Sequence, residues 1–495
     1  MGDVDTKMSK SAQQADTNPS GTDRLALQHT LVDKITKTFG CCNFTHGESL
    51  LSKYFAEYGA DETYWGFCSE LAIERTDFEA AHNYNQKIFE NYPEDFWSLF
   101  RTAKIAARTG DIAGALKSIQ AAEKVNPGYP ATQSFKAKLL LREGNVIEAL
   151  GTLEASLKAN PTDIWLLIDL IEIYDAQGRY AEALALLDNC YGRMSKKSKK
   201  IISKRRVSIS RNWKFEGQIR RNFDKIYGVL GGSVIVDVGA AGGLFWKWEI
   251  LSRMGVVKGI GFEPDADECR ASQALFPHNT FLQMAIAGKK GKTKLRIARN
   301  GPCTSLLEPN LKRMQRWPIR NCFETIKTIE ISAVTLSQAL SDAGIDKVDF
   351  LKVDVQGAEG EVLAGAGKYL DQLLGIELET HMVPLYKGER VFADLTGALD
   401  KWNFRLRGVE PQGSFEGEVV EIEAFYGRDT VGLSDLELRK LFLWEALSDC
   451  PQLPFMGDNK ALSSYPDLEA GMTEHDYRAA KLRRKTRKWV NPKSF

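Results

Sequence analysis

Residues 232–243 read GSVIVDVGAAGG, and this stretch indicates the architecture of the C-terminal half of the chain. The run 234–238 is apolar apart from Asp237, has the length of a buried strand, and leads into glycines at 239, 242 and 243. A glycine backbone can approach a ligand closely, and the N-terminus of a following helix presents unpaired N–H groups to an anion. The stretch therefore predicts the first strand of a doubly wound α/β sheet, with a nucleotide-type site at its carboxyl end.

The next apolar segment, VVKGIGFEPD at residues 256–265, predicts a second strand that ends at Glu263. This acid lies 24 residues after Gly239 (263 − 239), where a carboxylate can accept hydrogen bonds from both hydroxyls of a ribose. A helix cap or a surface charge is the alternative role. The dinucleotide fingerprint GxGxxG requires glycine at position 241, where this chain has alanine, so the pattern disfavours NAD and favours S-adenosylmethionine.

A third strand, in LKVDVQGAE at residues 351–359, ends in polar residues that packing does not explain. A carboxylate at the tip of an apolar run costs stability unless something pairs with it. In a doubly wound sheet, ligands lie beyond the carboxyl ends of the strands at the switch in strand order. We therefore expect Gly239, Glu263 and Asp354 to converge there.

The segment 334–366 resembles the distinctive block of the FkbM family of S-adenosylmethionine-dependent methyltransferases: a threonine-leucine helix start, a lysine strand and D-x-E/Q-G-x-E. Four further segments of this chain resemble motifs of the same family and occur in the family's order. They are VDVGAAGG, GFEPD, CTSLLEP at 303–309 and IELETH at 376–381. The resemblance covers about residues 231–427. It implies a class I, Rossmann-like domain with a seven-stranded mixed sheet, and O-methyl transfer (EC 2.1.1 class), in most members to sugars, glycans, lipids or secondary metabolites.

The motifs assign candidate roles to individual residues. The cofactor-binding candidates are Asp237, Gly239, Ala240, Gly242, Gly243, Glu263 and Pro264. Methyl transfer to a hydroxyl requires removal of a proton, for which Asp354 and His381 are the candidate catalytic bases. A pairing with Lys352 is the structural alternative for Asp354, and a satisfied structural histidine is the alternative for His381.

The candidate substrate-binding residues are Ser305, Gln356 and Glu359. Each has a structural alternative as well: a polar loop for Ser305, shaping of the site for Gln356, and a helix cap for Glu359. The eight cysteines and six histidines show no metal-ligand spacing, so we expect no metal.

The N-terminal half repeats with a period of 34 residues. Gly110, Gly144 and Gly178 follow this step (144 − 110 and 178 − 144). The step is kept by Pro93, Pro127 and Pro161 and by Ala81, Ala115, Ala149 and Ala183. A small alanine lets two helices approach closely, proline starts the turn between repeats and glycine closes a helix. The segment resembles a tetratricopeptide repeat array whose concave face suits a partner protein; an unrelated helical bundle is the alternative.

The sequence divides into five predicted parts. They are a mostly disordered tail (1–45), helical repeats (46–193), a basic linker and helix (194–230), the methyltransferase domain (231–430), and a C-terminal helix with a basic tail (431–495). Residues 404–410 and 418–429 predict an antiparallel pair that completes the sheet. The C-terminal helix is predicted to begin with a capping box, from Ser434 to Glu437.

Composition excludes a protein that is basic overall, because 66 Lys and Arg residues nearly cancel 65 Asp and Glu residues. No secretory signal or long apolar run is evident, which favours a cytoplasmic location, with a peripheral position at a membrane as the alternative. The basic segments 194–206 and 477–489 are either solvated or in contact with an anionic surface. No recognition module accompanies them, so we expect no specific nucleic acid binding.

These patterns together predict an O-methyltransferase that uses S-adenosylmethionine and acts on a hydroxyl of a carbohydrate or glycan. The repeats are expected to recruit a partner protein or the substrate. The alternative is a scaffold in which the second domain binds the cofactor without turnover.

Overall fold

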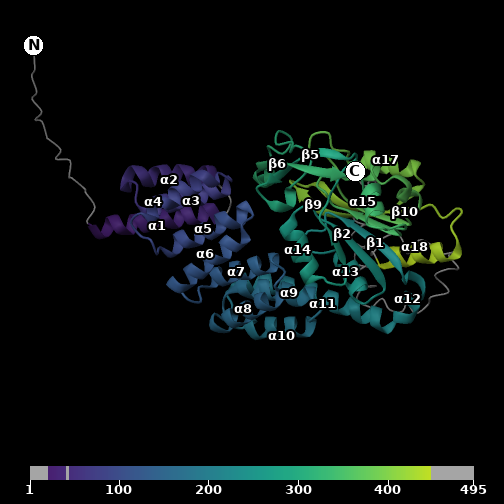
Figure 1. Cartoon of the computed structure of the whole chain (residues 1–495), viewed down its shortest axis with the longest axis horizontal. Helices are drawn as coiled ribbons and strands as arrows, with labels where there is room; N and C mark the ends of the chain where they lie inside the picture. The colour runs from purple at the N-terminus through teal and green to yellow at the C-terminus, as the bar shows by residue number, and fades with distance from the viewer. Residues whose placement is uncertain (1–20, 41–43, 448–495) are drawn as a thin grey trace, which may run out of the picture. The chain divides into compact units, whose positions relative to one another are not determined.

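The computed structural model describes residues 21–40 and 44–447 and contains two compact units, residues 1–105 and 106–495 (Figure 1). The N-terminal unit is helical. Its helices are α1 (Gly21–Gly40), α2 (Phe44–Tyr58), α3 (Glu62–Glu74), α4 (Phe78–Phe89) and most of α5 (Phe96–Thr109). The second unit holds the later repeats together with the α/β domain, so the structure does not separate them at the boundary near residue 193 that the sequence indicated.

Residues 21–40, which we expected to belong to a disordered tail, form α1. Leu31 and Ile35, spaced by one helical turn, are buried in a cluster with Leu51, Tyr54 and Cys68. The prediction of a tail is therefore wrong for this segment; residues 1–20 lie outside the described part.

The helical repeats continue into the second unit. Their helices are α6 (Ile112–Val125), α7 (Pro130–Arg142), α8 (Val146–Ala159), α9 (Ile164–Ala176), α10 (Tyr180–Tyr191), α11 (Lys196–Arg221) and α12 (Phe223–Leu230). The alanines that recur every 34 residues are fully buried, and the recurring glycines have left-handed φ angles of +91°, +83° and +70°. A side chain would strain that backbone, which explains glycine at the helix ends.

The period also fixes the helix starts. Asp77, Asp111 and Asn145, 34 residues apart, each accept a hydrogen bond from the backbone N–H three residues later. Residues 194–230, predicted as a basic linker and helix, contain two successive helices, α11 and α12, and Ile202 and Ile209 of α11 are buried in the core of the last repeats.

The α/β domain is built on a seven-stranded mixed sheet, as predicted, and its strand order is β3-β2-β1-β7-β8-β10-β9. Its strands are β1 (Ser233–Val238), β2 (Val257–Phe262), β3 (Thr280–Leu282), β7 (Phe350–Val353), β8 (Gly375–His381), β9 (Phe404–Phe415) and β10 (Glu418–Arg428). The first five in this order are parallel; β10 runs antiparallel to both β8 and β9. The strand order therefore reverses between β1 and β7, which is where such sheets bind ligands.

Helices cover both faces of this sheet. They are α13 (Trp246–Arg253), α14 (Ala266–Leu275), α15 (Leu336–Asp342), α16 (Glu359–Ala364), α17 (Phe392–Lys401) and α18 (Asp435–Leu447). On one face the ring of Phe350 is stacked between Trp248 of α13 and Trp444 of α18, with ring centroids 6.0 and 5.5 Å apart. The capping box at the start of α18 is confirmed, since the Ser434 N–H donates to Glu437 at 2.8 Å.

A second sheet of three short strands lies in the segment that links β3 to β7. Its strands are β4 (Ala285–Ile286), β5 (Gly291–Ala298) and β6 (Thr325–Val334), in the order β4-β6-β5. None of the described helices is long and apolar enough to cross a membrane.

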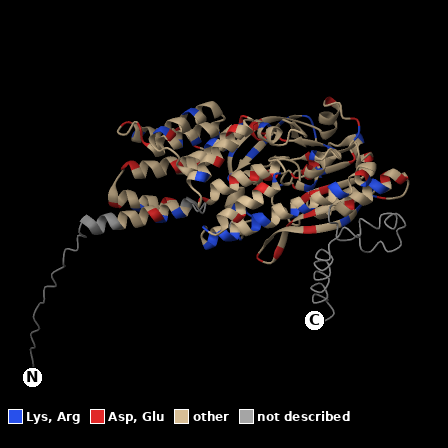
Figure 2. Cartoon of the chain, turned by 90° about the horizontal axis from the view of Figure 1, so that it is seen from below, with Lys and Arg blue, Asp and Glu red and all other residues tan. Residues whose placement is uncertain are grey.

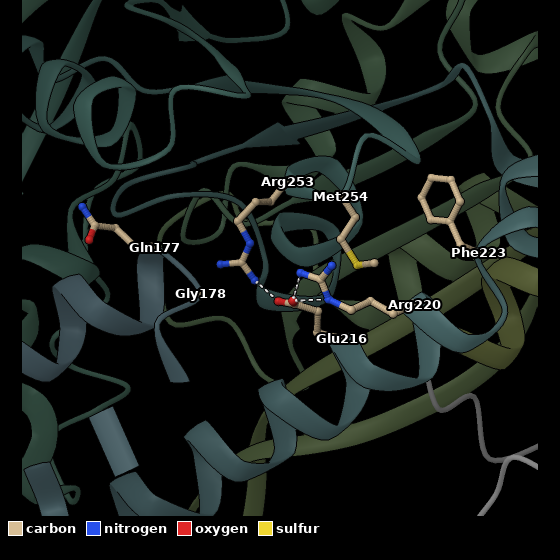
Figure 3. Close-up of a pocket in the computed structure, with 7 residues that line it drawn as sticks. All are labelled: Gln177, Gly178, Glu216, Arg220, Phe223, Arg253 and Met254. Atoms are coloured by element: carbon tan, nitrogen blue, oxygen red, sulfur yellow. Dashed lines mark hydrogen bonds and ion pairs between the residues drawn. The ribbon is translucent and has the colours of Figure 1, made fainter. Parts of the chain in front are cut away.

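The repeats pack on the helices that follow β1 and β2. Arg142 of α7 forms an ion pair with Glu268 of α14 at 3.0 Å. Arg253 of α13 donates to the Tyr180 hydroxyl and to Glu216, both at 2.6 Å. A cavity of about 510 Å³ lies beside this junction and is lined by Arg253, Glu216 and Arg220 among others (Figure 3). It lies at the end of α13 remote from the β1 carboxyl terminus, so it is separate from the site predicted there.

Replacing Arg253 by alanine is expected to destabilise the second unit by about 1–3 kcal/mol, because it leaves the buried Glu216 carboxylate and the Tyr180 hydroxyl without their shared donor. The free energy of unfolding in urea measures this effect. Lys292→Ala, which removes one side of the exposed Lys292–Glu330 pair, is the control and should cost less than about 1 kcal/mol. Equal effects of the two substitutions would show that Arg253 does not hold the junction.

Candidate active site

Gly239 and Asp354 meet at the switch point of the sheet. Gly239 has a φ of +94°, and a Cβ on it would lie 1.9 Å from the Asp354 carbonyl oxygen. The backbone N–H of Asp354 donates to the Val238 carbonyl at 2.9 Å. The predicted proximity of the glycine turn and the strand-end acid is therefore confirmed, although their chemical roles remain predictions.

The other glycines of the turn differ in their surroundings. A Cβ on Gly243 would lie 2.5 Å from the ring of Phe276, whereas one on Gly242 would meet nothing within 4 Å. Ala240 is buried beneath the turn, and Asp237 accepts a hydrogen bond from the Phe245 N–H at 3.0 Å. Asp237 and Ala240 thus support the turn from below, and the space above Gly242 is open to a ligand.

Glu263 follows β2 and faces the same end of the sheet. One carboxylate oxygen accepts from the Asp265 N–H at 2.8 Å, which leaves the other oxygen for a ligand. Pro264, next to it, is half-buried. Burial raises the pKa of Glu263 to about 7, so at neutral pH the group lies between its protonated and charged forms. An open glycine turn with a neighbouring buried carboxylate fits a cofactor that carries a ribose.

A hydrogen-bonded network surrounds Asp354. Gln356, whose φ is +54°, donates from its amide nitrogen to Asp354 at 3.2 Å and to Glu379 at 3.1 Å. Lys352 lies 3.7 Å from the other Asp354 oxygen. The Asp354 side chain is 27% exposed, so it is oriented by its neighbours and still accessible.

Acidic side chains line this face of the sheet along β8 and β10. Glu379 lies opposite Glu423, and His381 opposite Glu421, in the antiparallel register. Burial, together with Asp354 and Glu421, raises the pKa of Glu379 to about 10, so its carboxyl group is protonated at neutral pH. The sequence signal for this cluster was the pair of acids two residues apart in each strand, Glu377 and Glu379 in IELETH and Glu421 and Glu423 in EIE, but its significance depends on the strand pairing.

His381 is held in a buried ion pair. Its Nδ1 contacts the Glu389 carboxylate, which also accepts from the Leu385 and Tyr386 N–H groups. Burial lowers the pKa of His381, but Glu389 and Glu359 outweigh that effect and raise it above its ordinary value. The raised pKa favours the protonated imidazole, and the Glu389 carboxylate already occupies Nδ1 of the buried ring, which favours Asp354 over His381 as the base.

Ser305 and Glu359 are only 2% and 1% exposed. The Ser305 hydroxyl donates to the Gln356 carbonyl at 2.7 Å. Glu359 accepts from the N–H groups of Val355 and Gly357 at 3.1 and 3.0 Å. Burial removes both side chains from any surface that an acceptor could reach, so these contacts support the structural alternatives for them. Both residues fix the turn that carries Gln356, which alone of the three substrate-binding candidates is partly exposed.

The reversal of strand order, the glycine turn and the strand-end acids are features of a Rossmann-like fold with a ligand site at its switch point. Residues 237–406 match the Methyltransferase FkbM domain, and residues 140–189 match a tetratricopeptide repeat. Both matches agree with the resemblances that the motifs indicated.

Among characterised proteins, the chain is similar to the 2-O-methyltransferase NoeI of Sinorhizobium fredii. The two are 27% identical over 167 residues, which is 32% of this chain and 67% of NoeI. Among solved structures, a thermophilic tetratricopeptide repeat protein of Thermus thermophilus matches with 16% identity and a TM-score of 0.32, covering 37% of this chain and 98% of that protein. Yeast Tom70 matches with 18% identity and a TM-score of 0.33, covering 43% of this chain and 47% of Tom70. At these TM-scores the repeat assignment depends on the 34-residue period and the matched repeat rather than on these structures.

The pKa of Glu263 predicts how cofactor binding depends on pH. The charged carboxylate accepts hydrogen bonds from ribose hydroxyls more strongly than the neutral acid does, so binding should release a proton. The affinity for S-adenosylmethionine should therefore rise as the pH increases from 6 to 8, and calorimetry at several pH values measures it. Glu263→Gln, the matched control, should bind about tenfold or more weakly and without this pH dependence. The same pH profile in both proteins would contradict the role of Glu263.

Proposed function

We propose that the protein is an S-adenosylmethionine-dependent O-methyltransferase that acts on a hydroxyl of a carbohydrate or glycan. The observation that carries this proposal is the direct backbone contact between Gly239 and Asp354, which puts an accessible carboxylate beside the glycine turn. The match to the FkbM domain and the similarity to a 2-O-methyltransferase support the same reaction.

The cofactor would be held by the glycine turn and by Glu263, which would accept hydrogen bonds from its ribose. S-adenosylmethionine, when bound, supplies an electrophilic methyl group on a sulfonium. The protein must then orient the acceptor oxygen and remove its proton.

Asp354 is the proposed general base. Lys352 stabilises its negative charge from one side, and the Gln356 amide fixes its other oxygen. As the acceptor oxygen forms its bond to the methyl carbon, its proton would pass to the Asp354 carboxylate. His381 is not assigned this role, because its ring is buried and its Nδ1 is already held by Glu389.

The chemistry around Asp354 favours an uncharged acceptor that is rich in hydroxyl groups. Asp354, Glu379 and Glu421 are partly exposed on this face, and the cation that faces them, Lys352, is buried. Carboxyl groups form hydrogen bonds with sugar hydroxyls in either protonation state, whereas the ionised carboxylate that serves as the base repels a phosphorylated or carboxylated acceptor. This supports a neutral carbohydrate as the substrate.

The repeats would recruit a protein partner or the substrate. Ile147 and Trp165, on α8 and α9, are 86% and 65% exposed and offer apolar contact area for a bound segment.

Transfer of a labelled methyl group tests the proposed function. The protein is incubated with labelled S-adenosylmethionine and with separate glycan, lipid and protein fractions from its source, and the label should enter the glycan fraction. Asp354→Asn keeps the shape of the side chain, so cofactor affinity should persist while the rate falls by about 10² to 10⁴. Asp342→Asn, at an exposed acid of α15, is the matched control and should keep full activity.

If the Asp354→Asn variant turned over normally and the His381→Ala variant were folded but inactive, the base would be His381 and not Asp354. Binding of the cofactor without labelling of any fraction would favour the scaffold alternative.

A further inference from the structure

α11 carries an outward-facing row of cationic side chains. Consecutive residues of a helix are rotated by about 100°, so positions three, four and seven apart share one face. On α11 this face comprises Lys196, Lys200, Lys204, Val207, Lys214 and Arg221, which we call the α11 stripe. All six are exposed, and a helix of 26 residues is about 39 Å long. Figure 2 shows Lys and Arg gathered along this part of the molecule.

The acids near α11 do not neutralise this stripe. Arg205 and Arg206 pair with Glu172 and Asp188 of the neighbouring repeat helices, and Arg220 pairs with Glu216. These arginines lie outside the stripe. Within the part of the chain that the structure describes, Lys196, Lys200, Lys204 and Lys214 form no ion pair, so their charges are not neutralised; the first three lie within about 12 Å of helix, and Lys214 follows Lys204 after about 15 Å.

An apolar side chain is exposed among these cations. Val207, between Lys204 and Lys214 on the stripe, is 70% exposed. Trp213 is 49% exposed, but it is rotated by about 120° around the helix from Val207 and therefore lies outside the stripe. Nucleic acid phosphates gain nothing from an exposed valine, whereas the interface of a bilayer offers both anionic headgroups and an apolar layer that accepts it.

We propose that the α11 stripe docks the protein on the surface of a bilayer that contains anionic phospholipids. The positive charge of the stripe complements the lipid phosphates, and Val207 enters the interfacial layer. The helix lies on the membrane and does not span it. This inference is independent of the proposed methyl transfer, because it uses no residue of the active site.

Sedimentation with lipid vesicles tests the proposal on the full chain. Vesicles of phosphatidylcholine with phosphatidylglycerol should bind the protein, vesicles of phosphatidylcholine alone should not, and high salt should weaken binding. Each lysine near an anionic bilayer raises the binding affinity roughly fivefold. The triple variant in which Lys196, Lys200 and Lys204 are replaced by Ser should therefore bind these vesicles at least about tenfold more weakly. Val207→Ser should weaken binding without changing its salt dependence.

The control changes Lys117, Lys124 and Lys158 to Ser; these exposed lysines lie on α6 and α8, so net charge and helix propensity change equally. This variant should bind vesicles normally, and the melting temperatures of the two triple variants should agree. The proposal is overturned by an equal loss in both variants, by absence of binding to the anionic vesicles, or by stripe-dependent binding to duplex DNA without binding to vesicles.

Discussion

The close approach of Gly239 to the Asp354 carbonyl is the constraint on which the rest of the site depends. No side chain fits at position 239, because its Cβ would overlap the backbone of the neighbouring strand tip. That contact joins the glycine turn after β1 to the polar turn after β7. Glu359 and Ser305 then hold the second turn from beneath, and Gln356 orients Asp354. The reacting groups are therefore positioned by backbone packing and not by flexible loops.

The repeats and the methyltransferase domain share their supporting helices. α14 follows Glu263 directly and is contacted by Arg142 of α7, and α13 follows the glycine turn and is held by Tyr180 and Glu216 through Arg253. A structural change in the repeats would therefore reach both sides of the cofactor region. Removal of the repeats would uncover Arg253 and α14, so the α/β domain is not expected to behave as an independent unit.

Local patterns were sufficient for most of the fold. The 34-residue period predicted the helical repeats. The glycine turn and the strand-end acids predicted the doubly wound α/β sheet and the proximity of Gly239 to Asp354. The sequence did not show that Ser305 and Glu359 point inward, because burial depends on contacts between distant segments. The pairing of β8 with β10, which gathers Glu379 and Glu421, likewise has no local signature. The error at α1 had another origin, since Leu27, Leu31 and Ile35 recur at the four-residue spacing of a helix and already contradict a disordered tail.

The central claim is that the switch point of this sheet is a site for S-adenosylmethionine. Calorimetric titration of the full chain with S-adenosylmethionine and, separately, with NAD tests it most directly, because the glycine turn and Glu263 could in principle serve either cofactor. The account predicts saturable binding of S-adenosylmethionine with one site per chain, and no comparable binding of NAD. Tighter binding of NAD than of S-adenosylmethionine would contradict it.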